Sequence, residues 1–203
     1  PRELAGPEGP AYIEAEAHGG FLFTHRGYSG PSVLDVSHVA VRSAMGNEAR
    51  ATIRVRWSEL DASEWHRELT AANGLIAPVV GRRLPKRLAE QLVAECGLPA
   101  DRRASELRRE ERTTLVDRLV QYELPWTGDE GYKKAEVTGG GVALAEVDPR
   151  TLESRRHRGL FLCGELLDAF GPIGGHNFAW AWATGRLAGL GAAARHDRKG
   201  NNR

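Results

Sequence analysis

The chain has 203 residues, which suits one large or two small domains and allows a sizeable buried core. Its 28 Lys and Arg residues nearly balance its 27 Asp and Glu residues, and the net charge of +1 excludes the strongly basic footprint of many nucleic-acid-binding proteins. The sequence contains no run of about eighteen apolar residues and no signal peptide, so we expect neither a membrane partner nor a nucleic-acid partner.

Cysteine and histidine usage argues against disulfides and against a metal site. Cys96 and Cys163 are the two cysteines, one in a helical stretch and one in an apolar stretch, and both are typical of small buried hydrophobes. The seven histidines show no metal-like spacing with one another or with the cysteines, so we expect no metal ion. Two free cysteines fit a reducing compartment and predict a cytoplasmic protein.

Residues 1–59 are predicted to form the first part of a β-rich domain. Residues 11–17 alternate apolar and polar side chains as in a half-exposed strand, and residues 21–24 form a second short strand. Ser29, Gly30 and Pro31 are expected to open a helix, because Ser is a good N-cap and Pro is tolerated in the first helical turn. Residues 50–58 alternate most cleanly and give the best strand pattern of the sequence.

Residues 60–122 are predicted to be a helical insertion. Asp61 and Glu64 form a capping box at the start of a first helix, a second helix is closed by Gly97, and a third follows. Nine basic and six acidic residues lie between Arg82 and Arg112. The solvated faces of amphipathic helices account for these charges, and the alternative is a contact with a charged substrate or partner.

Residues 123–158 are predicted to return to the β-rich domain, with strand character at 135–138. The glycine run that follows lacks the frames G-x-x-x-x-G-K-[ST] and G-x-G-x-x-G and does not open a helix, so it is not a phosphate cradle. We expect a tight crossing between domains, where the backbone of Thr138, Gly139 and Gly140 lies close to a flat ligand.

Residues 159–195 carry the pattern of a buried strand, a glycine turn and a long apolar helix. The strand, 160–163, is continuously apolar, as in a strand covered on both faces. Glu165 and Asp168 follow its carboxyl end, the edge at which open α/β sheets bind ligands. These carboxylates could accept hydrogen bonds from ribityl or ribose hydroxyls, or could only cap and solvate a turn.

The glycine turn, 171–175, leads into a helix that begins near Asn177. This helix carries Phe178, Trp182, Gly185 and Gly189 along one stripe. Its first turn offers N–H groups and a positive dipole end to an anionic or carbonyl oxygen. Two interpretations stay open: a core strand and helix joined by a flexible turn, or the cofactor-gripping end of a dinucleotide-binding domain. The polar residues 196–203 are predicted to be disordered.

Three stretches resemble one bacterial flavoprotein family in its own motif order. CGELLDAFGPIGGHNFAWAWATGRLAG, from Cys163, is similar to the carboxyl-terminal FAD motif of that family. FLFTHRGYSGPSVL, from Phe21, is similar to its FTH-x-G-x-SGP segment, and AEVTGGGVALAEVDPRTLES, from Ala135, is similar to its A-x-VT-x-GGV…E segment. The family includes aminoacetone oxidase and proposed bile-acid reductases and lies in the glutathione-reductase-like superfamily.

The resemblance implies FAD as the cofactor. Glu165 takes the place of an acidic residue that bonds the ribityl chain, and the backbone of the Gly-Gly-His-Asn turn would face the O2 and N1 side of the flavin. The implied cofactor-binding residues are Gly164, Glu165, Asp168, Gly174, Gly175, His176 and Asn177. The family usually has Tyr or Phe where this chain has His176, which places a titratable ring near the flavin. The catalytic residues are not assigned; His25, inside the FTH motif, and His176 are candidates.

The sequence contains no strand–G-x-G-x-x-G–helix unit, and in this superfamily that ADP-gripping half lies at the amino terminus. Together with a start at Pro1 rather than Met, this predicts the carboxyl-terminal half of a flavoprotein. Its fold class would be α+β or α/β: a β-rich substrate-side domain with a helical insertion, plus the closing strand and helix of a Rossmann-like FAD-binding domain.

The predicted function follows from this half-protein reading. The chain would be a fragment of an FAD-dependent oxidoreductase acting on a small organic substrate. Oxygen (an oxidase) or NAD(P)H (a reductase) would be its redox partner. Without the missing amino-terminal FAD-binding half, the chain would bind FAD weakly or not at all and be inactive. The alternative is a stand-alone binding or interaction module that uses the helical insertion and has no redox activity.

Overall fold

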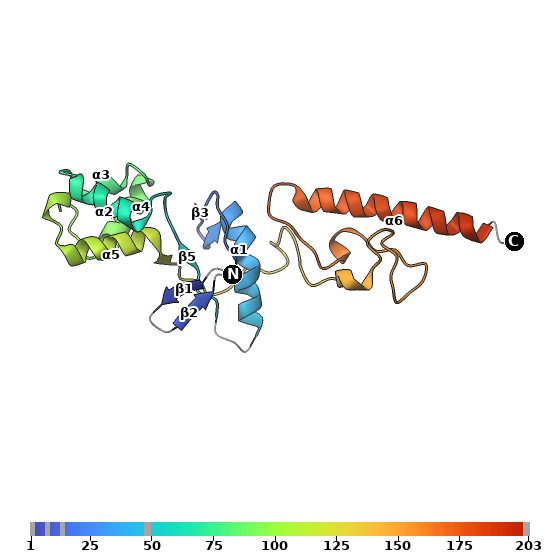
Figure 1. Cartoon of the computed structure of the whole chain (residues 1–203). Coiled ribbons are helices and arrows are strands. Elements are labelled where there is room, and N and C mark those ends of the chain that lie inside the picture. The colour runs from blue at the N-terminus through green and yellow to red at the C-terminus, as the bar shows by residue number, and fades with distance from the viewer. Residues whose placement is uncertain (1–2, 7–8, 13–14, 47–49, 201–203) are drawn as a thin grey trace. The chain divides into compact units, whose positions relative to one another are not determined.

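The computed structural model describes residues 3–6, 9–12, 15–46 and 50–200, and the chain forms two compact units (Figure 1). One unit comprises residues 50–127, and the other combines residues 1–49 with residues 128–203. Helices and two-stranded antiparallel sheets build the units, which confirms the predicted mixture of α and β structure. Among the described residues, no helix is both long enough and apolar enough to cross a membrane.

The unit of residues 50–127 is mostly helical. Its elements are β5 (Arg54–Val55), α2 (Ala62–Ala71), α3 (Ile76–Val80), α4 (Lys86–Glu95), the 3₁₀ turn Ala104–Glu106, α5 (Arg109–Val120) and β6 (Tyr122–Glu123). β5 and β6 pair antiparallel and thereby join the two ends of the helical stretch. The residues around β5 keep the predicted alternation of half-buried and exposed side chains. Only Arg54 and Val55 form strand, and they pair with the two residues of β6.

A capping box starts the first helix of this unit, as the sequence predicts. The Asp61 carboxylate accepts a hydrogen bond from the Glu64 backbone N–H (2.8 Å), and the Glu64 carboxylate accepts one from the Asp61 N–H (2.8 Å). The bond from the Glu64 backbone, with a second from the Ser63 hydroxyl, holds the pKa of Asp61 below its ordinary value. The amphipathic pattern that follows directs one face of each helix inward.

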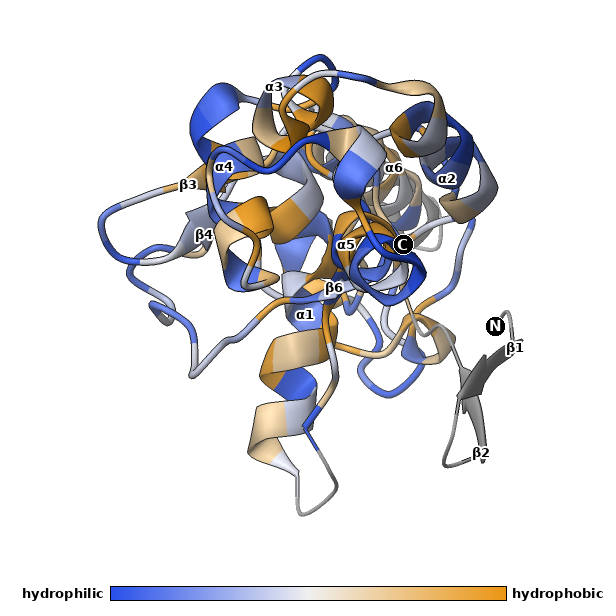
Figure 2. Ribbon diagram, turned by 90° about the vertical axis from the view of Figure 1, so that its left-hand side faces the viewer, coloured by the Kyte–Doolittle hydropathy of each residue, from blue (hydrophilic) through white to orange (hydrophobic). Residues whose placement is uncertain are grey.

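The four helices of this unit share one hydrophobic core. Figure 2 shows hydrophobic stretches alternating with hydrophilic ones along α3, α4 and α5. Every helix contributes apolar side chains at helical spacing, and the largest that are fully buried are Trp65, Leu69, Ile76, Val79, Val80, Leu92, Leu115, Val116 and Leu119. Burial of these side chains is the main source of stability for the unit.

The amino-terminal part of the other unit holds two hairpins and a helix. β1 (Glu3–Gly6) pairs with β2 (Gly9–Tyr12), β3 (Leu22–Phe23) pairs with β4 (Tyr28–Ser29), and α1 spans Pro31–Met45. Of the strand expected over 11–17, the first two residues belong to β2, 13–14 lie outside the described residues, and 15–17 are not strand. Gly30 precedes α1 with φ +100°, and a β-carbon there would lie 2.5 Å from the Gly20 carbonyl oxygen, so only glycine fits.

The carboxyl-terminal part does not contain the buried strand predicted at 160–163. Phe161 makes a single antiparallel bridge with Glu153, and Leu160 is 45% exposed. The prediction of a strand buried on both faces is therefore wrong for this structure, because no flanking strand pairs with it among the described residues. The stretch 135–138 is likewise not a strand.

Helix α6 (His176–Gly200) dominates the carboxyl-terminal part. It buries Thr184 and Ala188 and packs against Leu152 and Leu167. Of the predicted stripe, Phe178, Trp182 and Gly189 are exposed and Gly185 is half-buried. The helix also extends to Gly200, into the stretch 196–203 for which disorder is predicted, because no glycine or proline interrupts residues 192–199; residues 201–203 lie outside the described part.

Candidate functional site

The glycine turn before α6 is closed by a two-way contact with an asparagine. The Gly171 N–H donates to Asn177 Oδ1 (2.8 Å), and Asn177 Nδ2 donates to the Gly171 carbonyl (3.0 Å). Gly174 and Gly175 adopt φ of +122° and +93°, a region that favours glycine. The first helical bond then runs from the Ala179 N–H to the Gly175 carbonyl (3.0 Å). The helix thus begins directly after the turn.

The start of α6 has the features of an oxyanion-binding site. The first N–H groups of a helix have no carbonyl one turn earlier, and the helix dipole is positive at this end. A β-carbon added at Gly174 or Gly175 would meet no atom within 4 Å, so the backbone here is open to a ligand. His176 and its two neighbours in the turn are exposed. This arrangement suits the anionic edge of a bound molecule.

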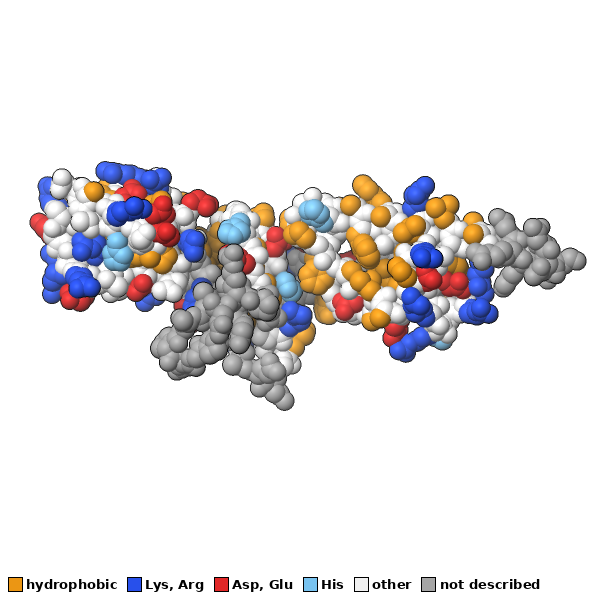
Figure 3. Space-filling model, viewed as in Figure 1, with side chains coloured by type: hydrophobic (Ala, Val, Ile, Leu, Met, Phe, Trp, Pro, Cys, Tyr) orange, Lys and Arg blue, Asp and Glu red, His pale blue; other side chains and the backbone are white. Residues whose placement is uncertain are grey.

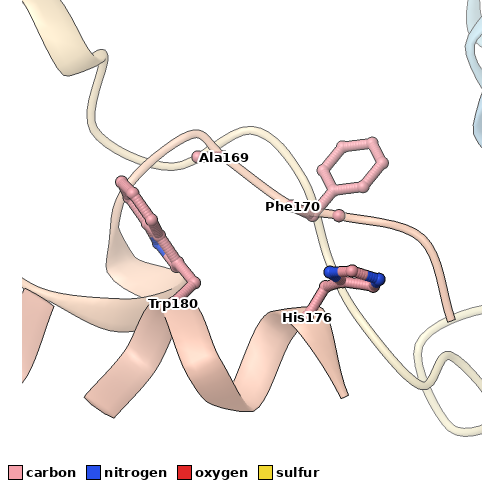
Figure 4. A pocket seen from close by; sticks show the side chains of 5 residues that line it. Ala169, Phe170, His176 and Trp180 are labelled. Atoms are coloured by element: carbon pink, nitrogen blue, oxygen red, sulfur yellow. The ribbon is translucent and has the colours of Figure 1, made fainter. Parts of the chain in front are cut away.

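A pocket of about 240 Å³ lies between this helix start and the preceding loop. Ala169, Phe170, Gly171, His176 and Trp180 line it. Figure 4 shows the Trp180 ring on one side of the hollow and the Phe170 and His176 rings on the other. Three ring systems around an open hollow suit a flat aromatic ligand.

The two predicted carboxylates contact the predicted glycine crossing. Glu165 Oε1 accepts hydrogen bonds from the Thr138 N–H (2.8 Å) and hydroxyl (3.3 Å), and Asp168 Oδ1 accepts one from the Gly140 N–H (2.8 Å). One oxygen of each carboxylate therefore caps a turn, which is the simpler of the two roles considered for them. Both side chains are exposed, and for the other oxygen of each no partner is recorded in the described part of the chain.

Glycines allow the two segments of this crossing to approach closely. A β-carbon at Gly139 would lie 2.9 Å from the Phe170 ring, and one at Gly141 would overlap the Leu166 carbonyl. Val142 and Leu167 form a parallel bridge next to them. Three backbone positions were expected to face a flavin. Two of them, Thr138 and Gly140, instead donate their N–H groups to the carboxylates of Glu165 and Asp168. The sequence pattern of the glycine run does not reveal these bonds.

Gly164 is fixed to α6 by both of its backbone groups. Its N–H donates to the Thr184 hydroxyl (2.9 Å), and its carbonyl accepts from the Trp180 indole N–H (3.1 Å). Its φ is +65°, and the residue is buried. The carboxylate of the next residue, Glu165, is therefore held at a defined place relative to the helix. Sequence reasoning missed Trp180 and Thr184, although they lie four residues apart on the helix that the FAD-like motif opens.

A helix distant in the sequence also contacts the glycine turn. The Ile173 N–H donates to Asp35 Oδ1 of α1 (2.7 Å), and the His38 ring lies edge-on to the Phe170 ring with centroids 5.3 Å apart. Sequence reasoning missed Asp35. The available signal was a single acidic residue within the apolar run after Pro31.

The two catalytic candidates occupy different places. His176 is the first residue of α6 and lines the pocket. His25 lies in the turn of the β3–β4 hairpin, where Thr24 and Gly27 make the recorded hydrogen bonds. No interaction recorded within the described ranges joins His25 to the pocket. The same part of the chain holds no group of three or more His, Cys, Asp or Glu placed to bind a metal ion.

The glycine turn, the pocket and the two carboxylates have the chemistry that an FAD molecule would require. The open backbone of Gly174 and Gly175 and the dipole of α6 match the electron-rich edge of a flavin, and the ring-lined pocket matches a flat ring system. Glu165 and Asp168 each keep an oxygen that can accept a hydroxyl hydrogen bond.

Comparison with known proteins gives consistent relatives. Residues 29–191 match the family model described as HI0933-like protein Rossmann domain. The chain is 36% identical over 187 residues to the "Ribosomal RNA dihydrouridine synthase" of Escherichia coli (strain K12), covering 89% of this chain and 45% of that protein. It is 35% identical over 174 residues to the protein of the same name from Haemophilus influenzae, covering 83% of this chain and 41% of that protein.

A further relative carries a different name. The chain is 36% identical over 190 residues to the "3-dehydro-bile acid delta(4,6)-reductase" of Clostridium scindens, covering 90% of this chain and 46% of that protein. The chain thus spans about half the length of the curated relatives it matches. Because the family model covers most of the chain, including the pocket and both of its flanking segments, the chain belongs to the HI0933-like Rossmann-domain family, within the FAD-dependent oxidoreductases.

Proposed function

We propose that this chain is the carboxyl-terminal part of an FAD-dependent reductase that saturates a carbon–carbon double bond conjugated with a carbonyl group. The observation that carries the proposal is the open turn at Gly174 and Gly175, which leads into α6 beside a pocket lined by three rings. The proposal is supported by the presence in one place of backbone N–H groups, a helix dipole and a ring-lined hollow, which together would suit a flavin ring.

The names of the relatives support the reductase over the oxidase. One name describes the formation of dihydrouridine in ribosomal RNA, and the other describes a delta(4,6)-reductase of a 3-dehydro bile acid. Both describe the saturation of a ring double bond in a molecule that also carries a carbonyl group. For this chain we propose the same bond type. A hydride adds to one carbon and a proton to the other, with NAD(P)H as the two-electron donor.

The residues of the chain would divide the work of binding. The N–H groups of the turn would hold the O2 and N1 side of the FAD ring, and Glu165 and Asp168 would accept hydrogen bonds from its hydroxyl-bearing chain. Phe170 and Trp180 would border the ring and exclude water. FAD, when bound, supplies the electron transfer. His176 would hold the proton for the substrate at one of its imidazole nitrogens.

We further propose that FAD binding requires an amino-terminal half that carries the G-x-G-x-x-G unit, a motif this sequence does not contain. Helix α6 supports this, because Phe178 and Trp182 are 69% and 75% exposed, and Leu190 on the same helix is 55% exposed. Figure 3 shows hydrophobic side chains gathered on this part of the surface. Exposed aromatic side chains of this size mark a contact surface. The apolar stretch 160–163, which pairs by a single bridge, supports the same proposal.

The test is an assay of the flavin-loaded protein, purified with its upstream coding region. NADH or NADPH is supplied with one of two probes, a 3-oxo-Δ4 steroid or a uridine-containing RNA oligonucleotide. The proposal predicts nicotinamide oxidation that depends on one probe and yields a product heavier by two hydrogens. Oxidation that depends only on oxygen and forms hydrogen peroxide would replace the reductase by an oxidase. A protein that binds no flavin would leave the stand-alone interaction module as the function.

A further inference from the structure

Helix α1 holds the glycine turn from outside the FAD-like motif. Asp35 lies 138 residues before Ile173 in the sequence, and its Oδ1 accepts the Ile173 N–H at 2.7 Å. We propose that Asp35 is a positioning residue, which clamps this turn and thereby determines which backbone N–H groups face the flavin. The inference rests on the proposed function, because it assigns a role toward FAD.

The hydrogen bonds of the turn leave a defined set of donors. Pro172 has no N–H, the Gly171 N–H is bonded to Asn177, and the Ile173 N–H is bonded to Asp35. Within the turn, the N–H groups of Gly174 and Gly175 remain, and His176 begins the helix. By this proposal, the bond to Asp35 fixes the orientation of the Pro172–Ile173 peptide plane and so restricts the directions in which the next N–H groups can point.

The clamp has a second contact that fixes the wall of the pocket. His38, three residues after Asp35 on the same face of α1, places its ring edge-on to the ring of Phe170. The Phe170 ring is confined on another side by Gly139, where a β-carbon would lie 2.9 Å from it. One face of α1 thus supports both the donor turn and an aromatic side of the pocket.

The choice of residue fits this role. A carboxylate forms stronger hydrogen bonds with an N–H than a neutral acceptor does, and the contact is half-buried, where solvent competes less. Asparagine at this position would keep an oxygen acceptor of the same reach, whereas alanine would leave the Ile173 N–H without its partner. The pair Asp35→Asn and Asp35→Ala therefore separates loss of the acceptor from loss of the charge.

The test compares both variants with Ser37→Ala, a control on the same helix whose hydroxyl donates to the Leu34 carbonyl within α1. Amide hydrogen exchange at Ile173, measured without FAD, reports the clamp itself. The FAD dissociation constant and the flavin midpoint potential, measured on the protein purified with its upstream region, report the positioning role.

We expect Asp35→Ala to speed exchange at Ile173 and to weaken FAD binding by about tenfold, the value of one lost hydrogen bond. The midpoint potential should become more negative, because misplaced N–H groups stabilise the reduced flavin less. In Asp35→Asn, the FAD affinity and the midpoint potential should stay close to those of the unchanged protein, and Ser37→Ala should resemble the unchanged protein in every measurement. An Asp35→Ala variant with faster exchange but unchanged FAD affinity and potential would reduce Asp35 to a structural residue and overturn the inference. A failure of the unchanged protein to bind FAD would instead refute the proposed function.

Discussion

The contact between Gly164 and Thr184 allows a quantitative prediction. Thr184 is buried, with 3% of its surface exposed. Its hydroxyl donates a hydrogen bond to the Trp180 carbonyl (2.6 Å) and accepts one from the Gly164 N–H (2.9 Å). Thr184→Val keeps the shape of the side chain but removes the acceptor. The buried Gly164 N–H then lacks a partner, which costs about 1–3 kcal/mol.

Native-state amide exchange at Gly164 measures this cost directly. We expect the opening free energy of Gly164 to fall by about 1–3 kcal/mol in Thr184→Val. Thr184→Ser keeps the hydroxyl and loses one buried methyl group, so its effect should be smaller, about 0.5–1 kcal/mol. Because Glu165 follows Gly164, the Val variant should also bind FAD more weakly in the flavin-loaded protein. Equal protection of Gly164 in the Val variant and the unchanged protein would refute the reasoning, since the hydrogen bond would then contribute nothing to the opening free energy.

Three further predictions concern the rest of the chain. Gly30→Ala should destabilise the unit that contains α1 by about 1–3 kcal/mol, measured by urea denaturation, because φ is +100° and the new methyl group would lie 2.5 Å from a carbonyl oxygen. The hydrogen bonds from Arg108, with a further one from Arg102, lower the pKa of Glu111 to about 2, so its contribution to stability is present above pH 4.5 and is lost as the pH falls through about 2. Acid titrations of the helical unit should therefore show a smaller loss in Glu111→Gln, and an unchanged acid profile would contradict this. Phe178→Lys with Trp182→Lys should leave the folding of this chain intact but abolish its association with an amino-terminal half, measured by copurification, whereas Ala183→Lys on a neighbouring face of α6 should not.

Local patterns in the sequence predicted a good part of the structure. The capping box at Asp61 and the glycine turn before α6 depend on residues within three or four positions of one another, so their physics is local. The pairing of Asn177 with Gly171 also falls within a short stretch. The FAD-like motif was therefore sufficient to locate the turn, the helix start and His176.

The remaining features depend on contacts that sequence spacing does not encode. The bond between Asp35 and Ile173 joins residues 138 positions apart, and the bonds of Glu165 and Asp168 reach back to the glycine crossing 27 and 28 positions earlier. The apolar run 160–163 matched a buried strand, but a strand also needs neighbours to pair with. The sequence shows that one stripe of α6 carries aromatic side chains. It does not show whether another segment covers that stripe, and in the structure Phe178 and Trp182 are exposed.

The central claim is that the turn before α6 binds FAD together with an amino-terminal half. The most direct measurement is the visible absorption spectrum of this chain, purified with and without its upstream coding region and then titrated with FAD. If the turn binds FAD in this way, flavin bands remain with the longer protein and are lost or greatly weakened with the chain alone. A longer protein that is colourless and leaves the spectrum of added FAD unchanged would show that the turn does not bind FAD.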